Sequence, residues 1–86
     1  IENAYTISNG EYEVIEAEIA ETSELINKEI KNSDLPEELR IGAVLRDKKV
    51  IIPRSNFIFK KDDKVVFIVK KDSISFVENI FRLSSV

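Results

Sequence analysis

Apolar and polar residues alternate over residues 12–19, which predicts a strand with one buried face. The apolar members fall on one side and two carboxylates on the other: Ile15, Ala17 and Ile19 against Glu16 and Glu18. The residues before this strand are polar. We therefore expect residues 1–11 to form a lead-in or linker, with one short extended piece at most.

Helix-start and helix-stop signals follow the strand. Thr22 and Ser23 are favourable at helix N-termini, and Asn27 tolerates a left-handed backbone, which predicts a tight turn there. A short helix is expected over 28–34. Pro36 ends it, because proline has no backbone N–H to donate.

A second short helix is expected near the end of the chain. Asp72 or Ser73 can cap its N-terminus. Its apolar residues lie along one stripe at helical spacing: Ile74, Val77, Ile80 and Phe81. The tail, 83–86, is expected to fray.

Three further strands are expected between the two helices, over 40–46, 50–53 and 64–70. The first two form a hairpin across Asp47 and Lys48. Because Lys48 stands where glycine is preferred, we expect a turn looser than the usual two-residue one.

Two of these strands carry apolar residues on both sides, whereas strands of a sheet with one face in water alternate apolar and polar residues. The opposing sets are Val65, Phe67 and Val69 against Val66 and Ile68, and Ile41, Ala43 and Leu45 against Val44. Two short helices cannot cover both faces, so we expect a homodimer or higher homo-oligomer. The alternative is that long Lys and Arg stems and the loop around Phe57 cover the second face.

The order strand, helix, strand, strand, strand, helix predicts an α+β fold, a small βαβββα-type sheet with two short helices. A chain of 86 residues has room for one domain, which we place at 12–86 after the lead-in. Because the first residue is Ile1 rather than Met, we expect a fragment of a longer protein; the alternative is a disordered start of the chain before Ile1.

The amino-acid composition excludes most kinds of catalytic site. The chain has no Cys and no His, which excludes disulfides, thiolate and imidazole ligands and the commonest general base. Two glycines cannot form a glycine-rich phosphate loop, and a formal net charge of -3 disfavours nucleic acid. We expect no enzyme and no metal site. A catalytic role for Glu16 and Glu18 is the weaker alternative to a solvated strand face.

An ordered series of segments resembles one family. It includes 15–19, 23–28, 50–54, 63–67, 73–74 and 77–81, and above all Leu35-Pro36-Glu37-Glu38-Leu39-Arg40-Ile41-Gly42-Ala43-Val44-Leu45-Arg46-Asp47. From Tyr12 to Phe81 the chain resembles the TrkA-C, or RCK C-terminal, domain of TrkA-type potassium-transport regulators. Family members usually have glycine where this chain has Asn27, Lys48 and Asp62.

The resemblance implies a dimerising, non-catalytic domain that senses a small ligand. It implies a cytoplasmic position, peripheral to the inner membrane face, and coupling to an integral-membrane potassium channel or transporter. NAD or ATP is expected only on a neighbouring Rossmann-type domain, and no cofactor in this one. The alternative function is the same sensor module on a transcription factor or on another cation transporter or exchanger.

Ligand-binding candidates are Asp34, Arg40 and Arg54, with Arg46 as a further anion-binding candidate. Surface arginines paired with the many Glu residues are the alternative. A subset of the family binds cyclic di-AMP through Asp-x-Arg and a following Asn. Here Leu35 and Pro36 follow Asp34, and Leu39 or Arg40 stands where the Asn is required, which disfavours that nucleotide.

Overall fold

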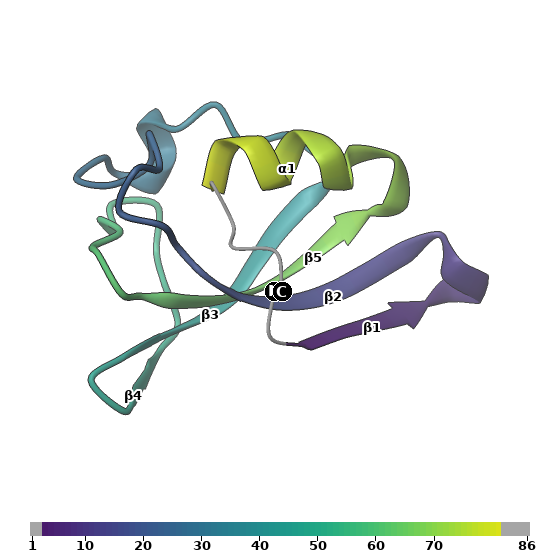
Figure 1. Ribbon diagram of the computed structural model, residues 1–86, viewed down its shortest axis with the longest axis horizontal. Helices are drawn as coiled ribbons and strands as arrows, with labels where there is room; N and C mark the ends of the chain where they lie inside the picture. Colours follow the sequence, from purple (N-terminus) through teal and green to yellow (C-terminus); the bar gives the residue numbers. More distant parts are fainter. Residues whose placement is uncertain (1–2, 82–86) are drawn as a thin grey trace.

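The computed structural model describes residues 3–81, which form a five-stranded antiparallel sheet with one α-helix across one face (Figure 1). The strand order is β1-β2-β5-β3-β4. The elements are β1 (Asn3–Ile7), β2 (Tyr12–Glu18), β3 (Leu39–Arg46), β4 (Lys49–Ile51), β5 (Lys64–Lys70) and α1 (Ile74–Phe81). The predicted α+β class is confirmed, and so is the order of the four predicted strands and the last helix.

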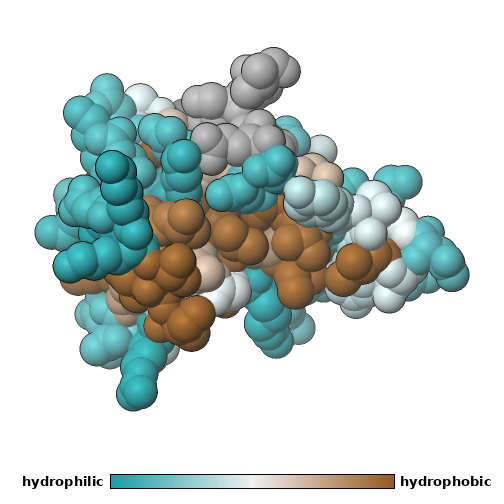
Figure 2. Space-filling view, turned by 90° about the horizontal axis from the view of Figure 1, so that it is seen from below, coloured by the Kyte–Doolittle hydropathy of each residue, from teal (hydrophilic) through white to brown (hydrophobic). Residues whose placement is uncertain are grey.

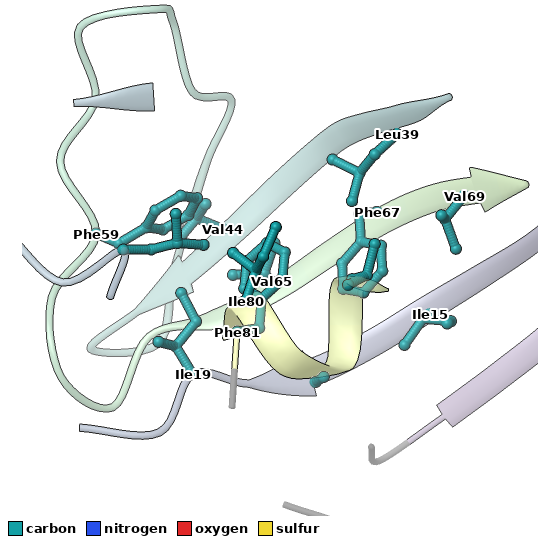
Figure 3. Close-up of a cluster of buried hydrophobic side chains, with 13 residues drawn as sticks. Ile15, Ile19, Leu39, Val44, Phe59, Val65, Phe67, Val69, Ile80 and Phe81 are labelled. Carbon is teal, nitrogen blue, oxygen red and sulfur yellow. The ribbon is translucent and has the colours of Figure 1, made fainter. Parts of the chain in front are cut away.

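The core lies between the sheet and α1, and β5 is its central strand (Figure 3). β5 pairs with β2 on one side and with β3 on the other, so its inward residues are covered on both sides. The stripe predicted for the last helix is confirmed, because Val77, Ile80 and Phe81 are buried. Phe81 stacks on Phe67 with ring centroids 5.3 Å apart. The expected fraying of the tail falls outside the described residues.

The helix expected over 28–34 is wrong. This segment contains only a 3₁₀ turn, Ile30–Asn32, preceded by an extended Glu29. The backbone N–H groups of Ile30 and Lys31 donate to the carbonyls of Phe57 and Ser55, at 2.9 and 2.8 Å, instead of to a helical turn. Hydrogen bonds to a distant loop therefore form in place of those of a local helix. Helix propensity does not predict such long-range bonds.

The β3–β4 connection is a tight two-residue turn, so the looser turn expected there is also wrong. Arg46 pairs with Lys49 directly across it. Asp47 and Lys48 both adopt positive φ, 51° and 66°, as a type I′ turn requires. Asn27 and Asp62 have φ of 68° and 71°. All three positions where the family usually has glycine thus adopt the left-handed conformation.

A β-bulge between Ile41 and Ala43 changes which residues of β3 share a face. Ile41 lies opposite Phe67 of the core face, whereas Ala43 lies opposite Val66 of the other face. The prediction that Ile41, Ala43 and Leu45 share one face is therefore wrong for Ile41, because one extra residue reverses the alternation.

The lead-in contributes the edge strand β1, which pairs with β2 from Asn3 to Ile7. All five residues of β1 are exposed. The strand therefore satisfies one side of β2 with hydrogen bonds but adds nothing to the buried core.

Candidate functional site

A hollow of about 340 Å³ lies beside the first half of β3. β4 pairs only with Val44–Arg46, so the Leu39–Ile41 half of β3 is bordered by loops. The lining residues are Ile30, Ser33, Leu35, Pro36, Glu37, Leu39, Arg40, Ile41, Pro53, Arg54 and Ser55. A volume of this size is at the lower end of the roughly 300–1,000 Å³ typical of small-molecule sites.

Backbone hydrogen bonds hold the two loops that border the hollow. Lys31 N–H donates to the Ser55 carbonyl at 2.8 Å, which joins the 3₁₀ turn to the segment after β4. Leu39 N–H donates to the Pro36 carbonyl at 3.1 Å, so the chain turns sharply into β3. The hydroxyl of Ser33 donates to the Glu29 carbonyl at 3.0 Å. Hydrogen bonds within the chain therefore hold the walls of the hollow in place.

Arg40 and Arg54 are the two cations of the hollow. Arg40 Nη1 donates to the carbonyls of Glu37, at 2.7 Å, and Leu39, at 3.0 Å, which leaves Nε and Nη2 without a protein acceptor among residues 3–81. The Arg54 side chain has no hydrogen-bond or ion-pair partner among those residues. Guanidinium groups with unused donors are the protein's strongest anion ligands.

The apolar part of the hollow comes from both loops and from β3. Ile30, Leu35 and Ile41 are half-buried and pack against the core. Glu37 contributes one carboxylate, so the lining carries two positive charges and one negative charge. An apolar lining with a net positive charge suits a ligand that has an apolar part and an anionic group.

Asp34 lies on the loop that forms one wall, but it is exposed and does not line the hollow. Its neighbours Ser33 and Leu35 do. Of the three predicted site residues, the structure thus brings Arg40 and Arg54 together and leaves Asp34 outside. The lining by Ile30, Leu35 and Pro53 was not predicted, since it depends on how two distant loops meet.

Arg46 is not available to bind an anionic ligand, because its guanidinium is already paired with the Asp63 carboxylate. Arg46 Nε and Nη2 donate to the two carboxylate oxygens of Asp63, at 2.8 and 2.7 Å. Nη2 also donates to the Ile58 carbonyl, and the guanidinium lies 4.8 Å from the centroid of the Phe57 ring. The hydrogen bonds that Arg46 donates to Asp63 raise the pKa of Arg46 above its usual value. Arg46 is therefore a structural residue.

Glu16 and Glu18 lie on β2 at successive positions of the sheet face that α1 does not cover. Glu16 accepts a hydrogen bond from Asn3 Nδ2 at 2.6 Å, and Glu18 is exposed. Neither lines any of the four main hollows formed by residues 3–81. Their surroundings are those of solvated strand residues.

No group of three or more acidic, His or Cys side chains among residues 3–81 is placed to hold a metal ion. No helix in this range is long and apolar enough to cross a membrane.

Solved structures share this fold. One described as "Structure of RCK domain with cda" superposes with a TM-score of 0.70 at 12% identity, covering 79% of this chain and 96% of that one. The "RCK_C domain dimer of S.agalactiae BusR in complex with c-di-AMP" also has a TM-score of 0.70, at 21% identity, covering 80% of this chain and 95% of that one. At these identities the likeness is one of fold.

Sequence comparison gives the family. The model of the TrkA-C domain matches residues 14–82. The Trk system potassium uptake protein TrkA of Azorhizobium caulinodans is 37% identical over 84 residues, which are 98% of this chain and 18% of that protein. TrkA homolog 1 of Methanosarcina mazei is 33% identical over 82 residues, 95% of this chain and again 18% of the relative. The chain therefore spans less than a fifth of these relatives, and it belongs to the TrkA-C domain family, as its ordered motifs predict.

Proposed function

We propose that this chain is a regulatory domain of a Trk-type potassium uptake system and that it binds an anionic small molecule in the arginine-lined hollow. The relatives that match it along almost its whole length are potassium uptake proteins. The observation that carries the ligand proposal is that Arg40 and Arg54, both with unused donors, line one hollow. The role is binding and signalling, without catalysis.

The chemistry of the hollow points to a phosphorylated ligand with an apolar part, such as a nucleotide. Guanidinium groups bind phosphate with two parallel N–H donors, and the isoleucine and leucine side chains offer contact to a base. The BusR domain of the same fold was solved in complex with c-di-AMP. In this chain Leu35 and Pro36 follow Asp34, so we favour a different anion over that dinucleotide.

Regulation requires that the ligand bind one arrangement of the assembled protein better than another. The coupling free energy in such systems is typically about 1–3 kcal/mol. We propose that two copies of the chain pair and that the bound ligand favours one geometry of the pair. This geometry would then change the activity of a membrane transporter at the inner face of the membrane. A neighbouring Rossmann-type domain would bind NAD or ATP. The alternative is the same module on a transcription factor or another cation transporter.

Calorimetric titration of the purified chain tests the ligand proposal. The probes are ATP, ADP, cyclic di-AMP and inorganic phosphate. We expect one of the nucleotides to bind, and Arg54→Ala and Arg40→Ala to weaken it about 10-fold or more, as loss of a charge-assisted hydrogen bond implies. Lys49→Ala is the control, because Lys49 is an exposed cation beyond the other end of β3. If none of the four probes binds, or if both arginine variants bind like the control, the proposed site is wrong.

Potassium uptake by cells that carry the whole protein tests the regulatory proposal. Deletion of residues 12–81 should change the uptake rate or its response to the nucleotide, whereas Lys49→Ala should not. Uptake that is unaffected by the deletion would contradict the Trk assignment. A DNA-binding domain before Ile1 would favour the transcription factor.

A further inference from the structure

The loop between β4 and β5 carries one of the two cations of the hollow at its exposed tip. Arg54, Ser55 and Asn56 are all exposed, so burial does not hold this tip in place. Farther along the loop, Phe59 is fully buried in the core, and its ring meets that of Phe57 edge-on at 5.6 Å. The position of Arg54 therefore depends on what fixes the few residues between it and Phe59.

Arg46 contacts this loop at two points. Its Nη2 donates to the Ile58 carbonyl at 2.9 Å, and its guanidinium lies 4.8 Å from the centroid of the Phe57 ring. The Phe57 N–H in turn donates to the Arg54 carbonyl at 3.0 Å, which closes the turn that presents Arg54. A continuous series of contacts thus runs from the guanidinium of Arg46 to the backbone of Arg54.

Asp63 holds Arg46 in the orientation that these contacts need. Both oxygens of its carboxylate accept hydrogen bonds from Arg46, at 2.8 and 2.7 Å, and one of them also accepts the Lys60 N–H. The Asp63 side chain is buried, whereas 29% of the Arg46 side chain is exposed. A planar guanidinium bound at two points has little freedom to rotate. Asp63 therefore fixes the plane of the group that contacts the loop.

β3 connects the two cations of the hollow. Arg40 lies in its first half, and Arg46 is its last residue. Because Arg46 contacts the loop that carries Arg54, a single strand sets the place of both cations. The loop is also bonded to the opposite wall, where the Ile30 N–H donates to the Phe57 carbonyl at 2.9 Å. Loss of the contacts at Arg46 should therefore loosen the loop from β3 and from that wall.

We propose that the Arg46–Asp63 pair positions Arg54 in the hollow, in addition to stabilising the fold. This inference deepens the proposed function and rests on it for the role of Arg54 as an anion ligand. Two guanidinium groups bind one anion well when they are held beforehand at the spacing that the anion requires. Loss of the pair should therefore weaken binding through Arg54, although Arg46 does not line the hollow.

Amide hydrogen exchange measured by NMR tests the positioning without a ligand. The double variant Arg46→Met with Asp63→Asn removes both charges together, so neither is left buried and unpaired. The N–H groups of Ile30 and Lys31 donate to the loop, and we expect them to exchange at least 10-fold faster in this variant. The Lys71 N–H is the internal reference, because its hydrogen bond joins the end of β5 to the residue before β2. Equal acceleration at all three amides, or none, overturns the proposal.

Calorimetric titration with the same four probes tests the consequence for binding. Affinity for the nucleotide that binds should fall at least 5-fold in the Arg46→Met, Asp63→Asn variant. In an Arg54→Ala background the same two changes should have no further effect, because the pair acts through Arg54. Additive losses overturn the proposal. If none of the probes binds the wild-type chain, the proposed ligand site is wrong, whereas the exchange rates still decide whether the pair positions the loop.

Two further variants complete the experiment. Val14→Ala is the control for lost stability, because Val14 lies on the sheet face opposite α1, where Figure 2 shows apolar side chains gathered. β5 separates its strand from β3, so affinity and the ratio of exchange rates should not change. Arg46→Lys is the milder variant if the double variant does not fold. Its ammonium keeps the charge beside Asp63 but cannot also bind the Ile58 carbonyl, and a wild-type ratio of exchange rates in it would contradict the proposal.

Discussion

Arg46 and Asp63 form a two-point ion pair, Nε to Oδ1 at 2.8 Å and Nη2 to Oδ2 at 2.7 Å. Asp63 is 1% exposed and also accepts the Lys60 backbone N–H at 2.8 Å. The pair thus joins the end of β3 to the end of the loop that precedes β5. It supports the loop whose backbone also replaces the helix expected over 28–34.

Replacement of Asp63 by Asn should therefore lower the free energy of unfolding by about 2–4 kcal/mol, since it leaves the buried side of Arg46 without its counter-charge. Urea denaturation followed by circular dichroism measures the change. Glu21→Gln is the control, because Glu21 and Lys61 form an ion pair in which both side chains are mainly exposed. A similar, small effect of both variants would show that the Arg46–Asp63 pair does not stabilise the fold.

Lys48 has φ of 66°, where a side chain is strained. Lys48→Gly should raise the free energy of unfolding by about 0.5–1 kcal/mol, because the relief of strain exceeds the extra entropy of an unfolded glycine. The thermal midpoint should rise with it. Lys49→Gly, one residue further in β4, should lower the midpoint instead. A lower midpoint for Lys48→Gly would contradict the assigned turn.

Phe81 fixes α1 to the sheet. Its ring stacks on Phe67 and meets the ring of Phe59 edge-on at 6.0 Å. Phe81→Ala should cost about 3–5 kcal/mol, enough to unfold much of a domain of this size. Phe76→Ala on the same helix is the control, because Phe76 is 51% exposed. The prediction fails if the two variants lose similar stability in a denaturant titration.

Ser23 connects two distant segments. Its hydroxyl donates to the Ile80 carbonyl at 2.8 Å and accepts the Leu25 N–H at 3.2 Å. Ser23→Ala should cost about 1–2 kcal/mol, because it leaves both buried backbone groups unpaired. Thr22→Ala beside it is exposed and should change little. Faster amide exchange at Leu25 in Ser23→Ala alone would report the lost bond, and unchanged exchange would contradict this role.

The candidate site shows where inference from the sequence ended. Charge alone identified Arg40, Arg54 and Arg46 as anion candidates, and nothing local distinguished them. The difference is tertiary: Asp63, seventeen residues away from Arg46, takes up that guanidinium. Arg40 and Arg54 are brought together by loops that hydrogen-bond across more than twenty residues. Contacts of this kind between distant residues cannot be predicted from the spacing of residues along the chain.

The sequence by itself determined the order of β2, β3, β4, β5 and α1, the inward stripe of β2, the stripe of α1 and the family. Each of these depends on a repeat of two or of 3.6 residues, or on an ordered series of motifs, and both are visible along the chain. Only the tertiary structure decided that 28–34 is not a helix, that a bulge reverses half of β3, and that β1 joins the sheet. Those outcomes depend on backbone hydrogen bonds to distant partners, which compete with local preference and are satisfied only once the chain is folded.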